Sequence, residues 1–333
     1  MIGSAGFRND GSDGSDGSDG SDGSDGSDGS DGSDGSDGSD GSDGSAGVSG
    51  IGAYSGRRTS ALLAQALWAT QGGLTLGYSG AGNPDTTLTP LPRAHAFDRW
   101  SKDVRGHQYQ FELLSGVVFN GSNASKATVK FPGGTSCVLP KPRYETSVAT
   151  LTAELKLVFN KAALRSDRMN EILTQVAVPY SFFAMVLNLQ PGRHRFTFEL
   201  MATAFRLSTV ISMQFKHHFR VRRPADRTPL IQPVLLTPGH GSYPGGHGAQ
   251  GYLVAAMLKD LIGATAGSEK DVQLTRLADR ISENRVIAGL HYPEDMVAGG
   301  TLGDALAKHL KDRAKLNNSA VKWLWGKAKG EWS

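Results

Sequence analysis

The C-terminal half of this 333-residue chain repeats one pattern, in which apolar residues return at the three- and four-residue spacing of a helix. The pattern runs through 147–179 and again through "FELMATAFRLSTVISMQFKHHF", which ends at Phe219. It continues in three further segments, 247–263, 271–289 and 294–311, and Gly or Pro punctuates their boundaries. Amphipathic helices bury their apolar faces against one another. The sequence therefore predicts a mainly α-helical fold, a bundle covering 147–333.

Residues 1–46 have a different character. From Asp10 to Asp43 an Asp recurs at every third position, set in Gly and Ser, and this tract holds 12 of the 32 acidic residues. Such a composition cannot bury a core, so we expect a disordered leader. A collagen triple helix would need proline, and a calcium-binding β-roll would need apolar positions to pack, and the tract has neither.

Residues 47–146 form a mixed region of helical and irregular chain. "TSALLAQALWAT" has the spacing of a helix, whereas "HQYQFELLSGVVF" and "ATVKF" alternate briefly, which predicts a small β-hairpin in otherwise irregular chain. At the other end of the chain, "VKWLWGKAKGEWS" has no clear helical register. We expect this tail to pack on the body or on a partner subunit, in a homo-oligomer that is a dimer or larger.

Charge and cysteine content limit the class of protein. After Ser45 the chain carries 34 basic and 20 acidic residues, an excess that attracts phosphate esters, oxyanions, halides or nucleic acid. Nucleic acid is the weaker candidate, because no Lys/Arg run or aromatic–basic interleaving appears. A single cysteine, Cys137, excludes a disulfide framework and a cysteine-rich zinc site. With no apolar signal core and no membrane-length apolar run, we expect a soluble cytoplasmic protein with no membrane partner.

Three segments carry residues suited to an anion. In "KHHFRVRRP", Lys216 is followed by Arg223, and Pro224 places that arginine in a loop beyond a helix end. Both cations can reach one anion, although the segment taken alone is more typical of a solvated basic helix end. In "SYPGGHGAQGYLVAAML", a glycine-rich turn leads into a helix whose first turn holds His247. A helix N-terminus offers unpaired N–H groups to an anion, or it is simply a turn with a capping histidine.

The third segment is "NRVIAGLHYPEDMVAG". Gly289 predicts that a helix stops before His291, and Pro293 predicts that the next helix starts there. His291 then lies in the connecting turn. Asp295, four residues later, can accept a hydrogen bond from one ring nitrogen and leave the other free.

Taken together, Lys-x6-Arg-Pro, Pro-Gly-Gly-His and Arg-x5-His-x3-Asp resemble, in that order, the three signature segments of one superfamily. It is the superfamily of type 2 phosphatidic acid phosphatases and vanadium-dependent haloperoxidases. The similarity covers Lys216 to Asp295 and the flanking helical pattern. It implies a helical bundle of the haloperoxidase and acid phosphatase type, with vanadate or phosphate held inside.

The resemblance also implies roles for single residues. Lys216, Arg223 and Arg285 would donate charge-assisted hydrogen bonds to the oxygens of vanadate or phosphate, joined by the backbone N–H of Gly246. His291 would be the one metal ligand, or the nucleophile toward phosphorus, with Asp295 orienting it. His247 would act as acid–base on the opposite apical group.

Gly245 departs from the family, which usually has serine at this point of the second segment. The missing hydroxyl is one hydrogen bond to the anion, about 1.5–3 kcal/mol if nothing replaces it. Weaker retention of the oxyanion is expected, and Gly245→Ser is expected to tighten vanadate binding. Water or a backbone N–H could also substitute for the hydroxyl.

Two chemistries share this set of residues, and the sequence favours a vanadate-dependent haloperoxidase. His240, seven residues before His247, falls where similar haloperoxidases place a residue beside the halide, which implies bromide or iodide rather than chloride. Its substrates would be hydrogen peroxide, halide and a small organic molecule. The alternatives are a soluble acid phosphatase with a phosphohistidine intermediate, and an attenuated anion-binding homologue. For the other histidines ordinary packing or solvent exposure is expected, and a solvated place on a helix for His309.

Overall fold

The computed structural model describes residues 65–66, 69–70, 96–177 and 179–332. The expected leader, 1–46, and nearly all of 47–95 lie outside these residues. Within "TSALLAQALWAT" the four described residues, 65–66 and 69–70, are helical. Everything described from residue 96 onward belongs to one compact unit.

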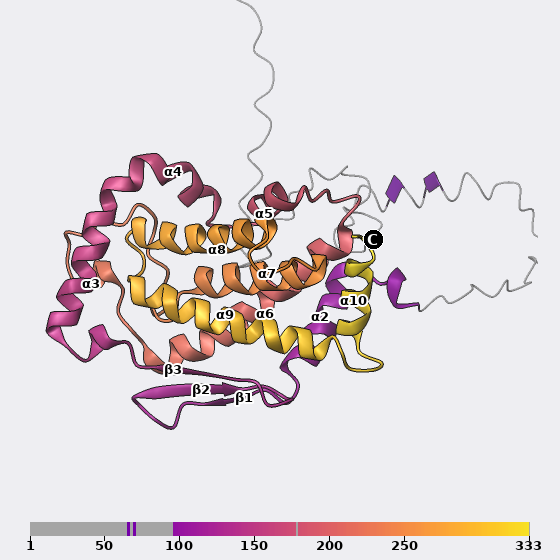
Figure 1. The fold of residues 1–333 in the computed structure, drawn as a ribbon, viewed down its shortest axis with the longest axis horizontal. Helices are drawn as coiled ribbons and strands as arrows, with labels where there is room; N and C mark the ends of the chain where they lie inside the picture. Colours follow the sequence, from indigo (N-terminus) through magenta and orange to yellow (C-terminus); the bar gives the residue numbers. More distant parts are fainter. Residues whose placement is uncertain (1–64, 67–68, 71–95, 178, 333) are drawn as a thin grey trace, which may run out of the picture. The chain divides into compact units, whose positions relative to one another are not determined.

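The described chain is mainly helical, which confirms the predicted fold class (Figure 1). The helices are α2 (Lys102–Leu114), α3 (Val148–Lys161), α4 (Arg165–Thr174), α5 (Tyr180–Leu187), α6 (Arg195–Phe219), α7 (Gly246–Ile262), α8 (Glu269–Ile287), α9 (Pro293–Arg313) and α10 (Ala320–Lys329). Short 3-10 turns occur at Phe97–Arg99, Arg143–Glu145, Ala162–Leu164 and Pro224–Asp226.

Helix α7 lies at the centre and packs against α9, α8 and α6 (Figure 1). Its contact with α9 is close because glycines face it. A Cβ on Gly299 would lie 2.4 Å from the carbonyl oxygen of Gly245, and one on Gly303 would lie 2.6 Å from that of Ala249. The two helices can approach to this distance only where a side chain is absent. This approach brings the start of α7 against the start of α9, where two of the three anion-suited segments lie.

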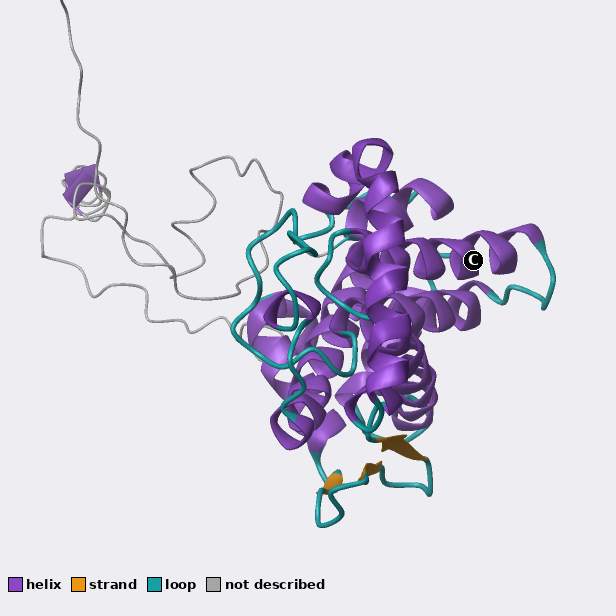
Figure 2. Ribbon diagram, turned by 90° about the vertical axis from the view of Figure 1, so that its left-hand side faces the viewer, coloured by secondary structure: helices purple, strands orange, loops and turns teal. Residues whose placement is uncertain are grey.

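Strands β1 (Val118–Asn120), β2 (Lys126–Lys130) and β3 (Ser136–Pro140) form an antiparallel sheet in that order, at one edge of the helices (Figure 2). Val129 of β2 pairs with Phe119 on one side and with Cys137 on the other. Alternate residues of β2 and β3 are buried, as in a sheet with one face on a core. The expected hairpin is therefore part of a three-stranded sheet.

Two expectations about local structure are wrong. The alternation in "HQYQFELL" predicted a strand, but these residues lie in α2, where Arg105, Tyr109 and Leu113 share one buried face at four-residue spacing. The tail, expected to have no helical register, forms α10 and buries Val321, Leu324 and Ala328. Tryptophans between those positions masked the period, because they are only partly buried against the same core.

The segment 147–179 also divides further than its pattern predicted. It contains α3, a 3-10 turn and α4, and the chain then leads through Pro179 into a separate helix, α5. Helix α4 packs on α8 and so reaches the neighbourhood of Arg285. Among the described residues, we find no helix with both the length and the hydropathy that a bilayer crossing requires.

Candidate functional site

The three anion-suited segments meet at one place. Lys216, in the last turn of α6, donates its ammonium protons to the carbonyl oxygens of Gly241 and Ser242, at 2.9 and 2.8 Å. Arg223, in the loop after α6, donates from Nε to the carbonyl of His240 at 3.1 Å and from Nη1 to that of Leu290 at 2.8 Å. The arginine therefore joins the chain just before the second segment to the third segment.

His291 lies in the turn between α8 and α9, as the sequence predicted, with Gly289 at a φ of 80° before it. Its Nδ1 lies 2.9 Å from Oδ2 of Asp295, and its Nε2 lies 3.3 Å from Nη1 of Arg223. A carboxylate accepts and a guanidinium donates, so Nδ1 carries the proton and Nε2 carries the lone pair. Burial, together with Lys216 and Arg223, lowers the pKa of His291 to about 3. The ring is thus neutral and presents a nucleophilic nitrogen.

Asp295 holds this tautomer in place. Its carboxylate, fully buried, accepts hydrogen bonds from Ser242 Oγ at 2.5 Å, from the Tyr144 hydroxyl, and from the Tyr292 backbone N–H at 3.1 Å. Burial alone would raise the pKa of Asp295, but the hydrogen bonds from His291, Ser242 and Tyr144 hold it below its usual value. The carboxylate stays ionised and keeps the proton on His291 Nδ1.

The cations of the site are buried. Lys216, Arg223 and Arg285 have 3 %, 1 % and 1 % of their surface exposed. Burial and the nearby Arg223 lower the pKa of Lys216 to about 7, and burial lowers that of Arg285 to about 10. Positive charge at this depth is costly unless an anion accompanies it. The donor set is therefore that of an anion site.

His247 lies in the first turn of α7 and is half-buried. Its Nε2 lies 3.0 Å from the carbonyl oxygen of Gln175, which can only accept, so that nitrogen carries a proton. Burial, Arg285 and His291 lower the pKa of His247 to about 3, so the ring is neutral and Nδ1 carries its lone pair. In this state Nδ1 has no proton to donate, and the proton on Nε2 is held by Gln175.

Arg285 lies in the last turn of α8, the helix on which α4 packs. Its Nη2 donates to the carbonyl of Ile172 at 3.0 Å and to Oε1 of Gln175 at 3.3 Å. Two buried donor atoms of this pair, Arg285 Nε and Gln175 Nε2, have no hydrogen-bond partner in the described part of the protein. Buried donors without acceptors are uncommon, and an oxyanion with several acceptor oxygens fits them. The residues present therefore suit vanadate or phosphate.

Gly245, at the start of α7, lies in a tightly packed environment. A Cβ on Gly245 would lie 2.0 Å from Cε of Met296 and 3.0 Å from the carbonyl oxygen of Asp295. Met296 thus occupies the space where a serine side chain would begin. Gly245→Ser was expected simply to restore a hydroxyl, but it first requires Met296 to move. A Cβ at Gly246, the first residue of α7, would meet nothing within 4 Å.

His240 is exposed, and its Nδ1 lies 3.3 Å from Nη2 of Arg223. Burial of part of the ring lowers its pKa, and so do Lys216 and Arg223. It therefore lies beside one of the buried cations, Arg223. The expectation of a solvated His309 is wrong, because that residue is fully buried, bonds the carbonyl of Leu113 at 2.8 Å and stacks on Phe131.

Sequence reasoning missed three contributors to the site. Ser242 stands inside the second segment, so its place beside the glycines was a signal that could have been used. Tyr144 and Gln175 lie 151 and 110 positions from the residues that they contact, Asp295 and Arg285, and nothing near them in the sequence marks them. In the described ranges no group of three or more His, Cys, Asp or Glu side chains is placed to hold a metal ion.

Comparison with known proteins gives a limited result. No protein-family profile and no curated protein sequence matches this chain. Among solved structures, the chain is similar to a transmembrane PAP2 type phosphatidylglycerolphosphate phosphatase from Bacillus subtilis. The two share 16% sequence identity at a TM-score of 0.41, over 52% of this chain and 90% of the phosphatase.

Proposed function

We propose that this protein is an enzyme of the phosphatidic acid phosphatase and haloperoxidase superfamily that holds a tetrahedral oxyanion among Lys216, Arg223, Arg285 and His291. One observation carries the proposal: the lone-pair nitrogen of His291 lies 3.3 Å from Arg223, while its other nitrogen is held by a buried carboxylate. Fixed cations stabilise an anion without reorganising, and a pre-oriented imidazole can bond to its central atom.

Within that superfamily we propose a vanadate-dependent haloperoxidase. Vanadate, when bound, supplies a Lewis-acidic centre that activates hydrogen peroxide toward halide, which is oxidised as the peroxide is reduced. Lys216, Arg223, Arg285 and the N–H of Gly246 would hold its oxygens, and His291 Nε2 would coordinate the metal. His247 is neutral with Nδ1 unprotonated, and a bound anion would raise its pKa, so that Nδ1 could accept a proton from hydrogen peroxide. His240 would border the halide, and hypohalous acid would halogenate a small organic substrate.

A phosphatase is the second candidate, favoured by the neutral His291 ring and the lone pair on its Nε2. Nε2 would attack phosphorus, forming an N–P bond as the P–O bond to the alcohol breaks, and water would then hydrolyse the phosphohistidine. This chemistry requires His247 to deliver a proton to the leaving oxygen. Its low pKa leaves the ring without that proton in the free protein, and a bound dianion would raise the pKa so that the ring could hold it.

A paired assay of one preparation, stripped of oxyanions and metals, tests the proposal. Bromination that requires both added vanadate and peroxide is the expected result. If the preparation instead hydrolyses an aryl phosphate, and vanadate inhibits that hydrolysis, the proposed function becomes that of a phosphatase. His291→Ala should abolish whichever activity is found, and His107→Ala, at an exposed position of α2, should retain it. Absence of both activities in the wild type, with no vanadate binding, would refute the proposal; vanadate binding without activity would leave the attenuated homologue.

A further inference from the structure

Gln175, at the C-terminal end of α4, is fully buried and belongs to none of the three signature segments. Its side-chain oxygen accepts from Asn284 Nδ2 at 3.0 Å and from Arg285 Nη2 at 3.3 Å. Its backbone oxygen accepts from His247 Nε2 at 3.0 Å. The residue that follows the last turn of α4 therefore contacts both His247 and one of the three buried cations.

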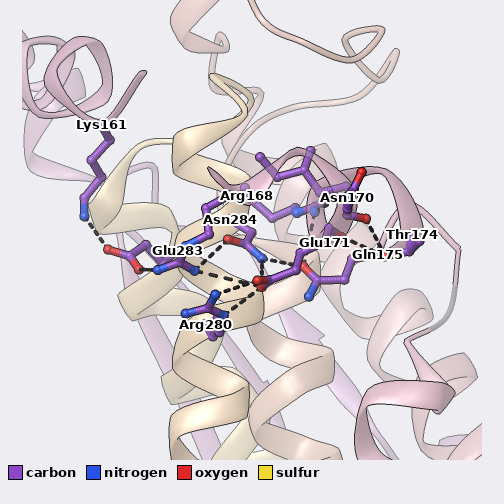
Figure 3. A network of polar contacts seen from close by, with 11 residues as sticks. Lys161, Arg168, Asn170, Glu171, Thr174, Gln175, Arg280, Glu283 and Asn284 are labelled. Atoms are coloured by element: carbon purple, nitrogen blue, oxygen red, sulfur yellow. Dashed lines mark hydrogen bonds and ion pairs between the residues drawn. The ribbon is translucent and has the colours of Figure 1, made fainter. Parts of the chain in front are cut away.

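The orientation of the Gln175 amide is determined by its neighbours (Figure 3). A guanidinium has only donors, so the amide atom that faces Arg285 must be oxygen. Asn284 is oriented in the same way, because Arg168 Nη1 donates to its Oδ1 at 3.1 Å and thereby directs its nitrogen toward Gln175. If the Gln175 amide flipped, its NH2 group would face the N–H donors of Asn284 and Arg285.

This leaves the Gln175 amide nitrogen, Nε2, buried with two N–H groups and no acceptor among the described residues. Nε of Arg285, on a side chain that Gln175 contacts, is in the same condition. A buried donor without a partner costs about 1–3 kcal/mol. Two of them on adjoining side chains indicate one missing acceptor with several oxygens, which is the chemistry of a tetrahedral oxyanion.

We propose that Gln175 donates its amide N–H to the bound oxyanion beside Arg285, a proposal that rests on the function proposed above. It supplies a neutral side-chain donor in a chain where Gly245 lacks the family's serine hydroxyl and Met296 occupies that space. Helix α4 thereby becomes a fourth segment of the site. The ion pairs that fasten α4 to α8, from Glu171 to Arg280 and from Arg168 to Glu283, hold the amide in position.

The decisive measurement is the affinity for inorganic phosphate and for orthovanadate, by calorimetry, with wild type, Gln175→Met and Gln175→Glu. Loss of a hydrogen bond to a charged group corresponds to a Kd about tenfold to a hundredfold higher. We expect that loss in Gln175→Met, which adds no charge, and a larger one in Gln175→Glu, where a carboxylate also repels the anion. Gln250→Met is the matched control, since that glutamine lies on α7 and bonds Thr209, and should stay within about twofold.

Melting temperature separates a ligand from a merely structural residue. In Gln175→Glu the new carboxylate still accepts from Asn284 and Arg285, so its anion-free Tm should not fall below wild type, whereas the Tm rise caused by phosphate should shrink. A structural role predicts the reverse: a lower anion-free Tm with the phosphate-induced rise retained. If wild type binds both anions and the two Gln175 variants bind them equally well, this inference is wrong and the proposed function stands. If wild type binds neither anion, the proposed function itself fails.

Discussion

At the residue scale, the site combines groups that are expensive to bury. Lys216 is the clearest case: burial lowers the pKa of its ammonium to about 7 from the usual 10.5. The unfolded chain therefore binds the proton more tightly than the folded protein does. The stability penalty is fully present below pH 7 and disappears as the pH rises toward 10.5, because above that value both states are neutral.

This predicts that Lys216→Met is more stable than wild type at pH 6 by about 2–5 kcal/mol without anion, and that the gap narrows by pH 10. Added phosphate should stabilise wild type more than the variant, because the variant lacks one of the three cations of the site. Urea unfolding at the two pH values, with and without phosphate, measures both effects. Lys308→Met, at an exposed position of α9, serves as the control. A wild type more stable than Lys216→Met at pH 6 would contradict the burial argument.

At the element scale, the site depends on how closely α7 approaches the start of α9. The N–H of Gly245 donates to the carbonyl of Asp295 at 2.8 Å, so the backbone that positions His247 is joined to the backbone that positions His291. Met296 fills the remaining space beside Gly245. The identity of residue 245 is therefore coupled to that of residue 296.

We accordingly expect Gly245→Ser alone to destabilise the protein by about 1–3 kcal/mol, since its Cβ overlaps Met296. The double variant with Met296→Ala should lose less unfolding free energy than the two single variants lose in sum, with a coupling energy of about 0.5–3 kcal/mol. A double-mutant cycle by urea unfolding gives this value, and vanadate titration shows whether the new hydroxyl then tightens binding. Met185→Ala, an exposed methionine on α5, should combine additively with Gly245→Ser. If the effects of Gly245→Ser and Met296→Ala on unfolding free energy were also additive, the overlap at position 245 would be relieved by movement of residues other than Met296.

At the scale of the whole described unit, carboxylates from distant parts of the chain hold the helix ends. Glu331, just after α10, accepts from the N–H groups of Phe196 and Thr197 and from the Thr197 hydroxyl, each at 2.8 Å. It thus caps the start of α6, the helix that carries Lys216 at its other end. Glu112 of α2 caps the start of α10 in the same way, at 2.9 Å from the N–H of Ala320.

Glu331→Gln should therefore lower the free energy of unfolding by about 0.5–2 kcal/mol, because a charged cap at a helix N-terminus becomes a neutral one. Guanidinium unfolding measures the change. Glu269→Gln, in the exposed first turn of α8, is the comparison. A smaller loss of unfolding free energy is expected there, because the hydrogen bond that Glu269 accepts from Gln273 lies within its own helix. An equal loss of unfolding free energy in both variants would show that the contact of Glu331 with the start of α6 adds no stability beyond that of an ordinary exposed glutamate.

The sequence by itself determined the helices that lie between Gly and Pro, and the order of Lys216, Arg223, His247, Arg285 and His291 along them. Periodicity and chain breakers act within a few turns, so they are legible from local residues. It also placed His291 in the turn between two helices, because Gly289 and Pro293 flank it. It misplaced α2 and α10, whose buried faces become evident only from what packs on them.

Only the tertiary structure decided which groups complete the site. Tyr144 and Gln175 reach Asp295 and Arg285 across more than a hundred residues, and Met296 excludes a side chain at position 245. Such contacts depend on how α4, α7, α8 and α9 pack against one another. No pattern within a single segment encodes that packing, because each contact depends on the position of two elements at once.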